Sequence, residues 1–264
     1  MPEFSNDEFR RQLRAADTEN RAAITSFREM LKRYFSGGRS PLTAEAKAEI
    51  LGVPLPGRRN FFTVGAAGLA GAVLLAACGS DDEPAAPAGA EDGDEADMDV
   101  VLARGAAATE LAAVAAYQAA IDSALVTTAA VSQAAGLFQR HHREHADALN
   151  AIVTDGDGEA VEDTLPAVQA LLDDASFTDE LTVVAFARTI EDAAASTYVA
   201  GAGLLSTPDL RQALMSIGGV EARHVTALDM AMLALGAGPG ATFEDGAFYP
   251  TERALPAEQL TALG

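Results

Sequence analysis

Three glutamates and three histidines stand at positions where the sequence pattern favours apolar residues. In four segments, apolar side chains recur at alternating steps of three and four residues, the spacing of one helix face. The polar residues inside these stripes are Glu110, His142, His145, Glu191, Glu221 and His224. A buried carboxylate without a partner is costly, so it is neutralised, paired or bound to a cation. Carboxylates and imidazoles that face inward from several helices form a ligand set for one or two transition-metal ions.

The four stripes predict the helices that must position these residues. They cover residues 100–121, 131–152, 184–205 and 210–235, each long enough for about six to seven helical turns. Only a few residues join the first helix to the second and the third to the fourth, so each pair is expected to form an antiparallel hairpin. The stretch 155–178 is long enough to cross the bundle. The sequence therefore predicts an all-α four-helix bundle with one long crossover between helices two and three.

The two predicted hairpins repeat each other. Glu110 precedes Tyr117 by the same interval that separates Glu191 from Tyr198. The second helix carries His142 and His145, and the fourth carries Glu221 and His224, again at equal spacing. Duplicated hairpins predict a site with two-fold symmetry between them.

This arrangement resembles the ferritin-like di-metal carboxylate superfamily, most closely its exported members, which include a desiccation-associated group. The resemblance covers residues 98–237. Its pattern is one Glu on helices one and three, matched by Glu110 and Glu191, and Glu-x-x-His on helices two and four. Glu221 with His224 matches that motif fully, and His145 matches its histidine on helix two. The resemblance implies iron or manganese as cofactor, with oxidase, peroxidase or catalase activity as candidate functions.

Helix two departs from this pattern, because His142 replaces the motif glutamate. Three carboxylates around two divalent ions leave a net charge of about +1, which favours imidazole-preferring metals. A mononuclear site, a non-catalytic metal-sequestering protein and a structural surface module with a degenerate site therefore stay open as alternatives. Glu144 could substitute if the helix is locally distorted. His141 lies off the stripe and is expected to be solvated, whereas Tyr117 and Tyr198 are expected in the core.

The composition excludes several other functions. A net charge of -21 and a pI of about 4.4 argue against a nucleic-acid surface, which needs a basic face. One cysteine excludes a disulfide scaffold and a thiolate-cluster metal site. The hydrophobic fraction of 49% rests mainly on alanine, with only 6% aromatics, which favours packed helices over strands.

The charge changes sharply near residue 60, where the sequence reads like an export signal. Arg58 and Arg59 precede an apolar run that ends at Ala77, directly before Cys78, the only cysteine. The pattern resembles a twin-arginine signal followed by a lipobox, within residues 58–78. It implies the twin-arginine export machinery as a partner, a lipid anchor on Cys78, and a location on the outer face of the cytoplasmic membrane, periplasmic or at the cell surface.

The remaining segments flank this signal and the bundle. Residues 1–57 are expected to form a helical extension from about residue 6 to 35, either cytoplasmic, removed on processing, or a product of a misassigned start. Residues 79–97 are acidic and rich in Ala, Gly and Pro, which predicts a disordered tether. Residues 238–264 are expected to wrap over the bundle. The tether argues against a large storage cage, and the oligomeric state stays open.

Overall fold

The computed structural model describes residues 6–36, 94–164, 169–170, 172 and 175–237. Within these residues the fold is all-helical, as predicted, and contains five long helices. They are α1 (Asn6–Ser36), α5 (Asp94–Asp122), α6 (Ala129–Asp155), α8 (Glu180–Ala202) and α9 (Pro208–Ala234). The predicted signal with Arg58, Arg59 and Cys78, most of the tether and the C-terminal wrap lie outside the described residues.

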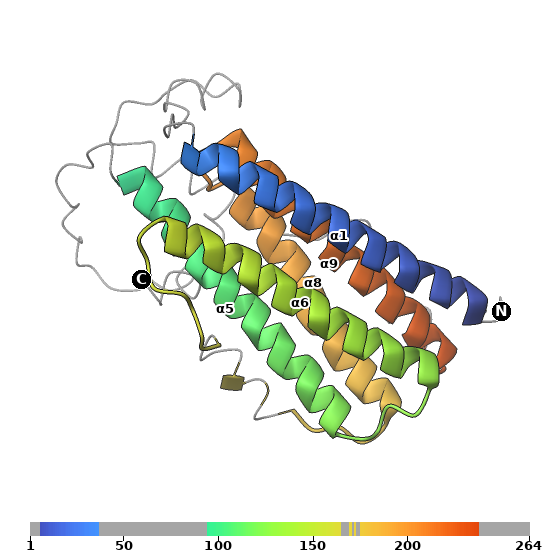
Figure 1. Ribbon diagram of the computed structural model, residues 1–264. Coiled ribbons are helices and arrows are strands. Elements are labelled where there is room, and N and C mark those ends of the chain that lie inside the picture. The colour runs from blue at the N-terminus through green and yellow to red at the C-terminus, as the bar shows by residue number, and fades with distance from the viewer. Residues whose placement is uncertain (1–5, 37–93, 165–168, 171, 173–174, 238–264) are drawn as a thin grey trace, which may run out of the picture.

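The last four helices form the predicted bundle (Figure 1). α5 packs against α6 and α8 against α9, so the two hairpins are as expected, and α5 also contacts α8. The connection from α6 to α8 is the long crossover between helices two and three. α5 begins at Asp94, earlier than the predicted start of the bundle at residue 98.

Local capping residues set where the last two helices begin. The Asp179 carboxylate accepts a hydrogen bond from the Thr182 backbone N–H and caps α8. The Thr207 hydroxyl accepts from the Leu210 N–H at the start of α9, where Pro208 occupies the first turn. Proline suits the first turn of a helix, because a backbone N–H at that position has no partner within the helix.

The N-terminal helix α1 packs along the bundle as a fifth helix. It contacts both α6 and α9 and lies across the face that these two helices form (Figure 1). The sequence predicted the helix itself, but not this position. Its buried face carries Phe9, Leu13, Ile24 and Phe27, which join the apolar core of the bundle.

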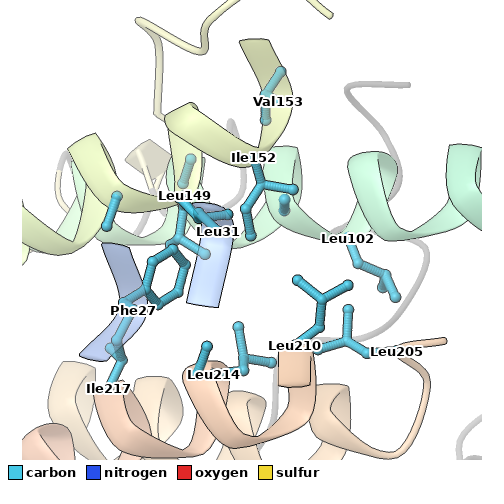
Figure 2. Close-up of a cluster of buried hydrophobic side chains, with 14 of the residues drawn as sticks. Phe27, Leu31, Leu102, Leu149, Ile152, Val153, Leu205, Leu210, Leu214 and Ile217 are labelled. Atoms are coloured by element: carbon cyan, nitrogen blue, oxygen red, sulfur yellow. The ribbon is translucent and has the colours of Figure 1, made fainter. Parts of the chain in front are cut away.

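Two apolar clusters fill the core at separate levels along the helices. One contains Phe27, Leu149 and Ile217 (Figure 2), and the other contains Phe9 and Phe138. On α6, α8 and α9, the predicted site residues fall between the parts that contribute to these two clusters, and on α5 Glu110 lies two residues before Ala112, where the first cluster ends on that helix. The clusters therefore enclose a polar layer at the middle of the bundle.

One core helix would pass for a membrane span by length and hydropathy. This segment of α5, Asp99–Asp122, packs against α6 and α8, and most of it is buried inside the bundle. Its apolar side chains pack in the core of the bundle, and its one buried glutamate, Glu110, lies in the polar layer.

Candidate metal centre

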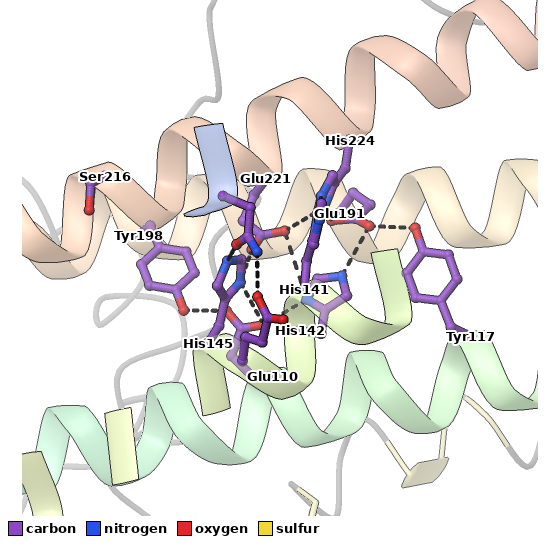
Figure 3. A network of polar contacts seen from close by, with 12 residues as sticks. Glu110, Tyr117, His141, His142, His145, Glu191, Tyr198, Ser216, Glu221 and His224 are labelled. Carbon is purple, nitrogen blue, oxygen red and sulfur yellow. Dashed lines mark hydrogen bonds and ion pairs between the residues drawn. The ribbon is translucent and has the colours of Figure 1, made fainter. Parts of the chain in front are cut away.

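The fold brings all six predicted ligands into one buried cluster (Figure 3). Each of these side chains is at most 1% exposed. They form two overlapping groups of four, in which the ligand atoms lie within 4.8 Å of one another. Glu110 and His145 belong to the first group, Glu191 and His224 belong to the second, and His142 and Glu221 belong to both.

His142 stands between the two halves of the site. Its Nδ1 lies 2.6 Å from Glu110 Oε2, and its Nε2 lies 3.0 Å from Glu191 Oε1. The imidazole that replaces the expected glutamate thus offers one nitrogen to each half. The alternative substitution by Glu144 is not seen: α6 is α-helical from Ala129 to Asp155, and the Glu144 carboxylate contacts Asn20 instead.

The remaining histidines direct Nδ1 toward the carboxylates. His224 Nδ1 lies 3.2 Å from both Glu191 Oε2 and Glu221 Oε2. His145 Nδ1 lies 2.7 Å from Glu221 Oε1, yet neither atom has a hydrogen-bond partner among the described residues. Two buried polar atoms that approach each other without hydrogen-bond geometry are costly, unless a third atom lies between or beside them. The donor set therefore fits a bound transition-metal ion.

Two tyrosines each donate a hydrogen bond to a glutamate of the opposite hairpin, and these two glutamates, Glu110 and Glu191, are called the outer glutamates. The Tyr117 hydroxyl donates to Glu191, and the Tyr198 hydroxyl donates to Glu110, so each hairpin supports the glutamate of the other. Both rings are buried, as the sequence indicated. Burial and the neighbouring carboxylates raise the pKa of both hydroxyls well above the usual range, so they stay protonated donors.

The site balances negative against positive charge. Burial opposes ionisation of His145, but the Glu110 and Glu221 carboxylates outweigh it and raise its pKa to about 9. Burial likewise opposes the charge on His142, whose pKa nevertheless lies well above its usual range because Glu191, Glu221 and Glu110 surround it. The two histidines in turn overcome the burial of Glu110 and hold its pKa at about 2. Without metal, protons on the imidazoles therefore compensate the carboxylates.

The prediction that His141 is solvated is wrong. The side chain is fully buried, and its Nδ1 lies 3.0 Å from His224 Nε2. α1 covers this part of α6, and Asp17 Oδ1 lies 3.4 Å from His141 Nε2. Burial, reinforced by the neighbouring imidazoles of His224 and His145, lowers the pKa of His141 to about 3, so this ring is neutral.

Two residues that sequence reasoning missed lie beside the site, both on α1. Asn20 is 1% exposed, and its Oδ1 lies 2.8 Å from His145 Nε2. Asp17 contacts His141 and Arg140. A signal was present in the sequence, because Asn20 interrupts the apolar stripe of the N-terminal helix in the same way that the glutamates interrupt theirs.

A small apolar pocket lies next to the centre. It is lined by residues of α5, α8 and α9, including Leu102, Ala194 and Leu214, and has a volume of about 30 Å³. Tyr198, whose hydroxyl donates to Glu110, also lines it. The volume suffices for a water-sized molecule.

Comparison with known proteins identifies one family. The model of a family described as the ferritin-like domain matches residues 97–234, which is more than half of the chain. No curated protein and no solved structure matches the chain.

Proposed function

This chain belongs to the ferritin-like domain family, and on that premise we propose that it binds one or two transition-metal ions, iron or manganese, through its buried glutamates and histidines. The observation that carries the proposal is the convergence of three carboxylates and three imidazoles in a cluster with almost no solvent exposure, where the ligand atoms of each group of four lie within 4.8 Å of one another. Carboxylates and imidazoles that converge in this way form a ligand set for transition-metal ions.

The ligands divide into two half-sites that share residues. Glu110 with His145 would hold one ion and Glu191 with His224 a second, and Glu221 belongs to both groups. His142 offers a nitrogen to either half, so the number of ions depends on whether it stays protonated or becomes a ligand. A carboxylate-bound pair of iron or manganese ions supplies two-electron chemistry toward oxygen or peroxide, which is the proposed activity.

The surrounding residues suit such chemistry. Tyr117 and Tyr198 keep the outer carboxylates in place, and the apolar clusters exclude bulk water from the polar layer. The pocket beside Tyr198 gives a small uncharged molecule a place next to Glu110. These features support oxidase, peroxidase or catalase activity over the binding of a large substrate.

The proposed location is outside the cytoplasm. Arg58 and Arg59, the apolar run and Cys78 support export by the twin-arginine route and anchoring through a lipidated cysteine. A route that exports folded proteins would allow the metal to be loaded before transport.

Metal analysis of the full chain tests the proposal. The chain carries Cys78→Ser to prevent lipidation, and it is expressed with added iron and manganese. We expect one or two ions per chain, and their loss in Glu191→Gln. The matched control is Asp192→Asn, because the neighbouring Asp192 pairs with Arg188 and belongs to neither ligand group. A folded wild-type chain without metal would overturn the proposal and favour the alternative, a structural module whose polar core is held by its own ion pairs.

A further inference from the structure

The contacts of α1 with the polar layer go beyond packing. Along the buried face of α1, apolar residues give way to Asn20 at the level of the metal ligands, between Ala16 in one apolar cluster and Ile24 in the other. A buried amide is retained in a helix–helix interface when its hydrogen bonds are satisfied. Asn20 meets this condition, because both ends of its amide have partners.

The chemistry of its partners determines how the Asn20 amide is turned. Glu144 Oε2 lies 2.6 Å from Asn20 Nδ2, and an ionised carboxylate only accepts hydrogen bonds. The amide oxygen of Asn20 must therefore face His145 Nε2, 2.8 Å away, and accept from its N–H. Once His145 is neutral, the proton stays on Nε2 and the lone pair on Nδ1, which is the unsatisfied atom beside Glu221.

A second chain of contacts reaches the other half-site. The Asp17 carboxylate accepts from His141 Nε2–H at 3.4 Å, which leaves the lone pair of this neutral ring on Nδ1. His141 Nδ1 then accepts from His224 Nε2–H at 3.0 Å. The lone pair of His224 is thereby placed on Nδ1, which faces Glu191 and Glu221.

We infer that α1 is part of the metal centre, in which Asn20 and Asp17 are positioning residues that direct Nδ1 of His145 and of His224 toward the ions. The inference rests on the proposed metal site and adds the segment that controls its histidines. Groups that hold the outer nitrogen of a ligating histidine fix its orientation and strengthen metal binding.

Charge complementarity holds α1 in the required register. Residues 61–264 contain only seven arginines. The side chains of two of them form ion pairs with α1: Arg140 of α6 pairs with Asp17 at 2.9 Å, and Arg223 of α9 pairs with Glu19. Asp17 and Glu19 both lie within one turn before Asn20, and their pairs with α6 and α9 keep Asn20 level with His145.

Histidine ¹⁵N NMR of the metal-free full chain carrying Cys78→Ser tests the positioning directly. At a pH high enough to leave His145 neutral in the spectrum, we expect the Nε2–H tautomer of this ring, because Asn20 Oδ1 lies 2.8 Å from Nε2. In Asn20→Leu the acceptor is lost, and His145 should shift to the Nδ1–H tautomer, donating to a carboxylate. The double variant Asn20→Asp with Glu144→Gln keeps both hydrogen bonds, with donor and acceptor exchanged only in the bond between positions 20 and 144, and should restore the original tautomer. An Nδ1–H tautomer in the wild-type chain, or no change in Asn20→Leu, would overturn the inference.

Binding of Mn²⁺, followed by its EPR signal, supplies the second readout. We expect Asn20→Leu to weaken Mn²⁺ binding by about 10- to 100-fold, with recovery in the double variant. Ile24→Ala is the matched control, since it loosens the packing of α1 one turn away without touching a histidine. Equal losses of Mn²⁺ affinity in Asn20→Leu and Ile24→Ala would show that Asn20 acts only through the packing of α1, and would overturn the inference. If the wild-type chain binds no metal while the tautomer pattern holds, the proposed function fails and the positioning role stands.

Discussion

At the scale of single residues, the centre is a balanced set of three carboxylates and three imidazoles. Each histidine lies within 3.2 Å of at least one carboxylate oxygen. Burial opposes the charged form of Glu110, Glu191 and the three histidines, but the attraction between carboxylates and imidazoles outweighs it, because the interior screens charges far less than water does. Protons and metal ions therefore compete for the same nitrogen atoms.

Metal affinity should consequently rise with pH. The pKa of His145 is about 9, and that of His142 lies well above its ordinary value, so an ion that uses these nitrogens must displace protons. We expect the association constant to increase by about tenfold per pH unit for each proton released, up to about pH 9. Titration of Mn²⁺ into the full chain at pH 6.5–9, by calorimetry in buffers of different ionisation heat, measures both quantities.

The folding stability of the metal-free protein should fall as the pH rises. A pKa that folding raises contributes stability that is fully present below the unfolded value, about 6.5 for histidine, and is lost as the pH rises toward about 9. Urea unfolding of the metal-free chain should therefore show declining stability across this range. A flat profile, together with pH-independent Mn²⁺ binding, would contradict the charge balance described above.

At the scale of the helices, close approach of α8 and α9 places Tyr198 at the site. A Cβ atom added at Gly218 would lie 2.9 Å from Tyr198 Cβ, so only glycine allows this contact. Gly218 therefore permits the close contact between the two helices. Gly219 has nothing within 4 Å of an added Cβ.

These neighbours make a matched pair of substitutions. Gly218→Ala should lower the free energy of unfolding by about 1–3 kcal/mol, because Tyr198 or the helices must shift. Gly219→Ala should raise it by about 0.5–1 kcal/mol, since alanine favours the helix and meets no neighbour. Urea unfolding of the metal-free proteins measures both changes. Equal effects of the two substitutions would contradict the close contact.

At the scale of the whole molecule, α1 joins parts that are distant in sequence. Besides its contacts at the metal centre, Tyr34 near its end donates to Asp99 of α5 at 3.1 Å. Asp99 also accepts from the backbone and side chain of Ser206, in the connection between α8 and α9. The predicted signal lies between α1 and α5, so processing at Cys78 would cut the covalent link between α1 and the bundle.

We expect α1 to stay bound after such a cut. A protease site inserted between residues 37 and 93 allows cleavage of the full, Cys78→Ser chain in solution. The fragment with α1 should co-elute with the bundle in gel filtration, because aromatic side chains such as Phe9 and Phe27 are fully buried against it. Phe27→Ala should weaken this association by about 3–5 kcal/mol and release the fragment on dilution. Separation of the wild-type fragments at micromolar concentration would show that α1 docks only while tethered.

The sequence alone determined most of the bundle and its ligand set. Periodicity predicted the four long helices, and their connections predicted the hairpins and the crossover. Six polar residues in apolar stripes pointed to a common buried layer, and Glu110, His142 and Glu221 indeed meet there with the others. These features follow from local spacing, because a helix puts residues three and four apart on one face.

Only the tertiary structure decided what surrounds that layer. Nothing in the local pattern shows that Asn20 meets His145, that His141 is buried, or that Tyr198 holds the glutamate of the opposite hairpin. Each of these contacts joins helices far apart in the chain, and a stripe of apolar residues states which face is buried but not what covers it. Here the covering element is α1. Its sequence shows that one face is buried, but the same sequence would be compatible with packing at another place on the bundle.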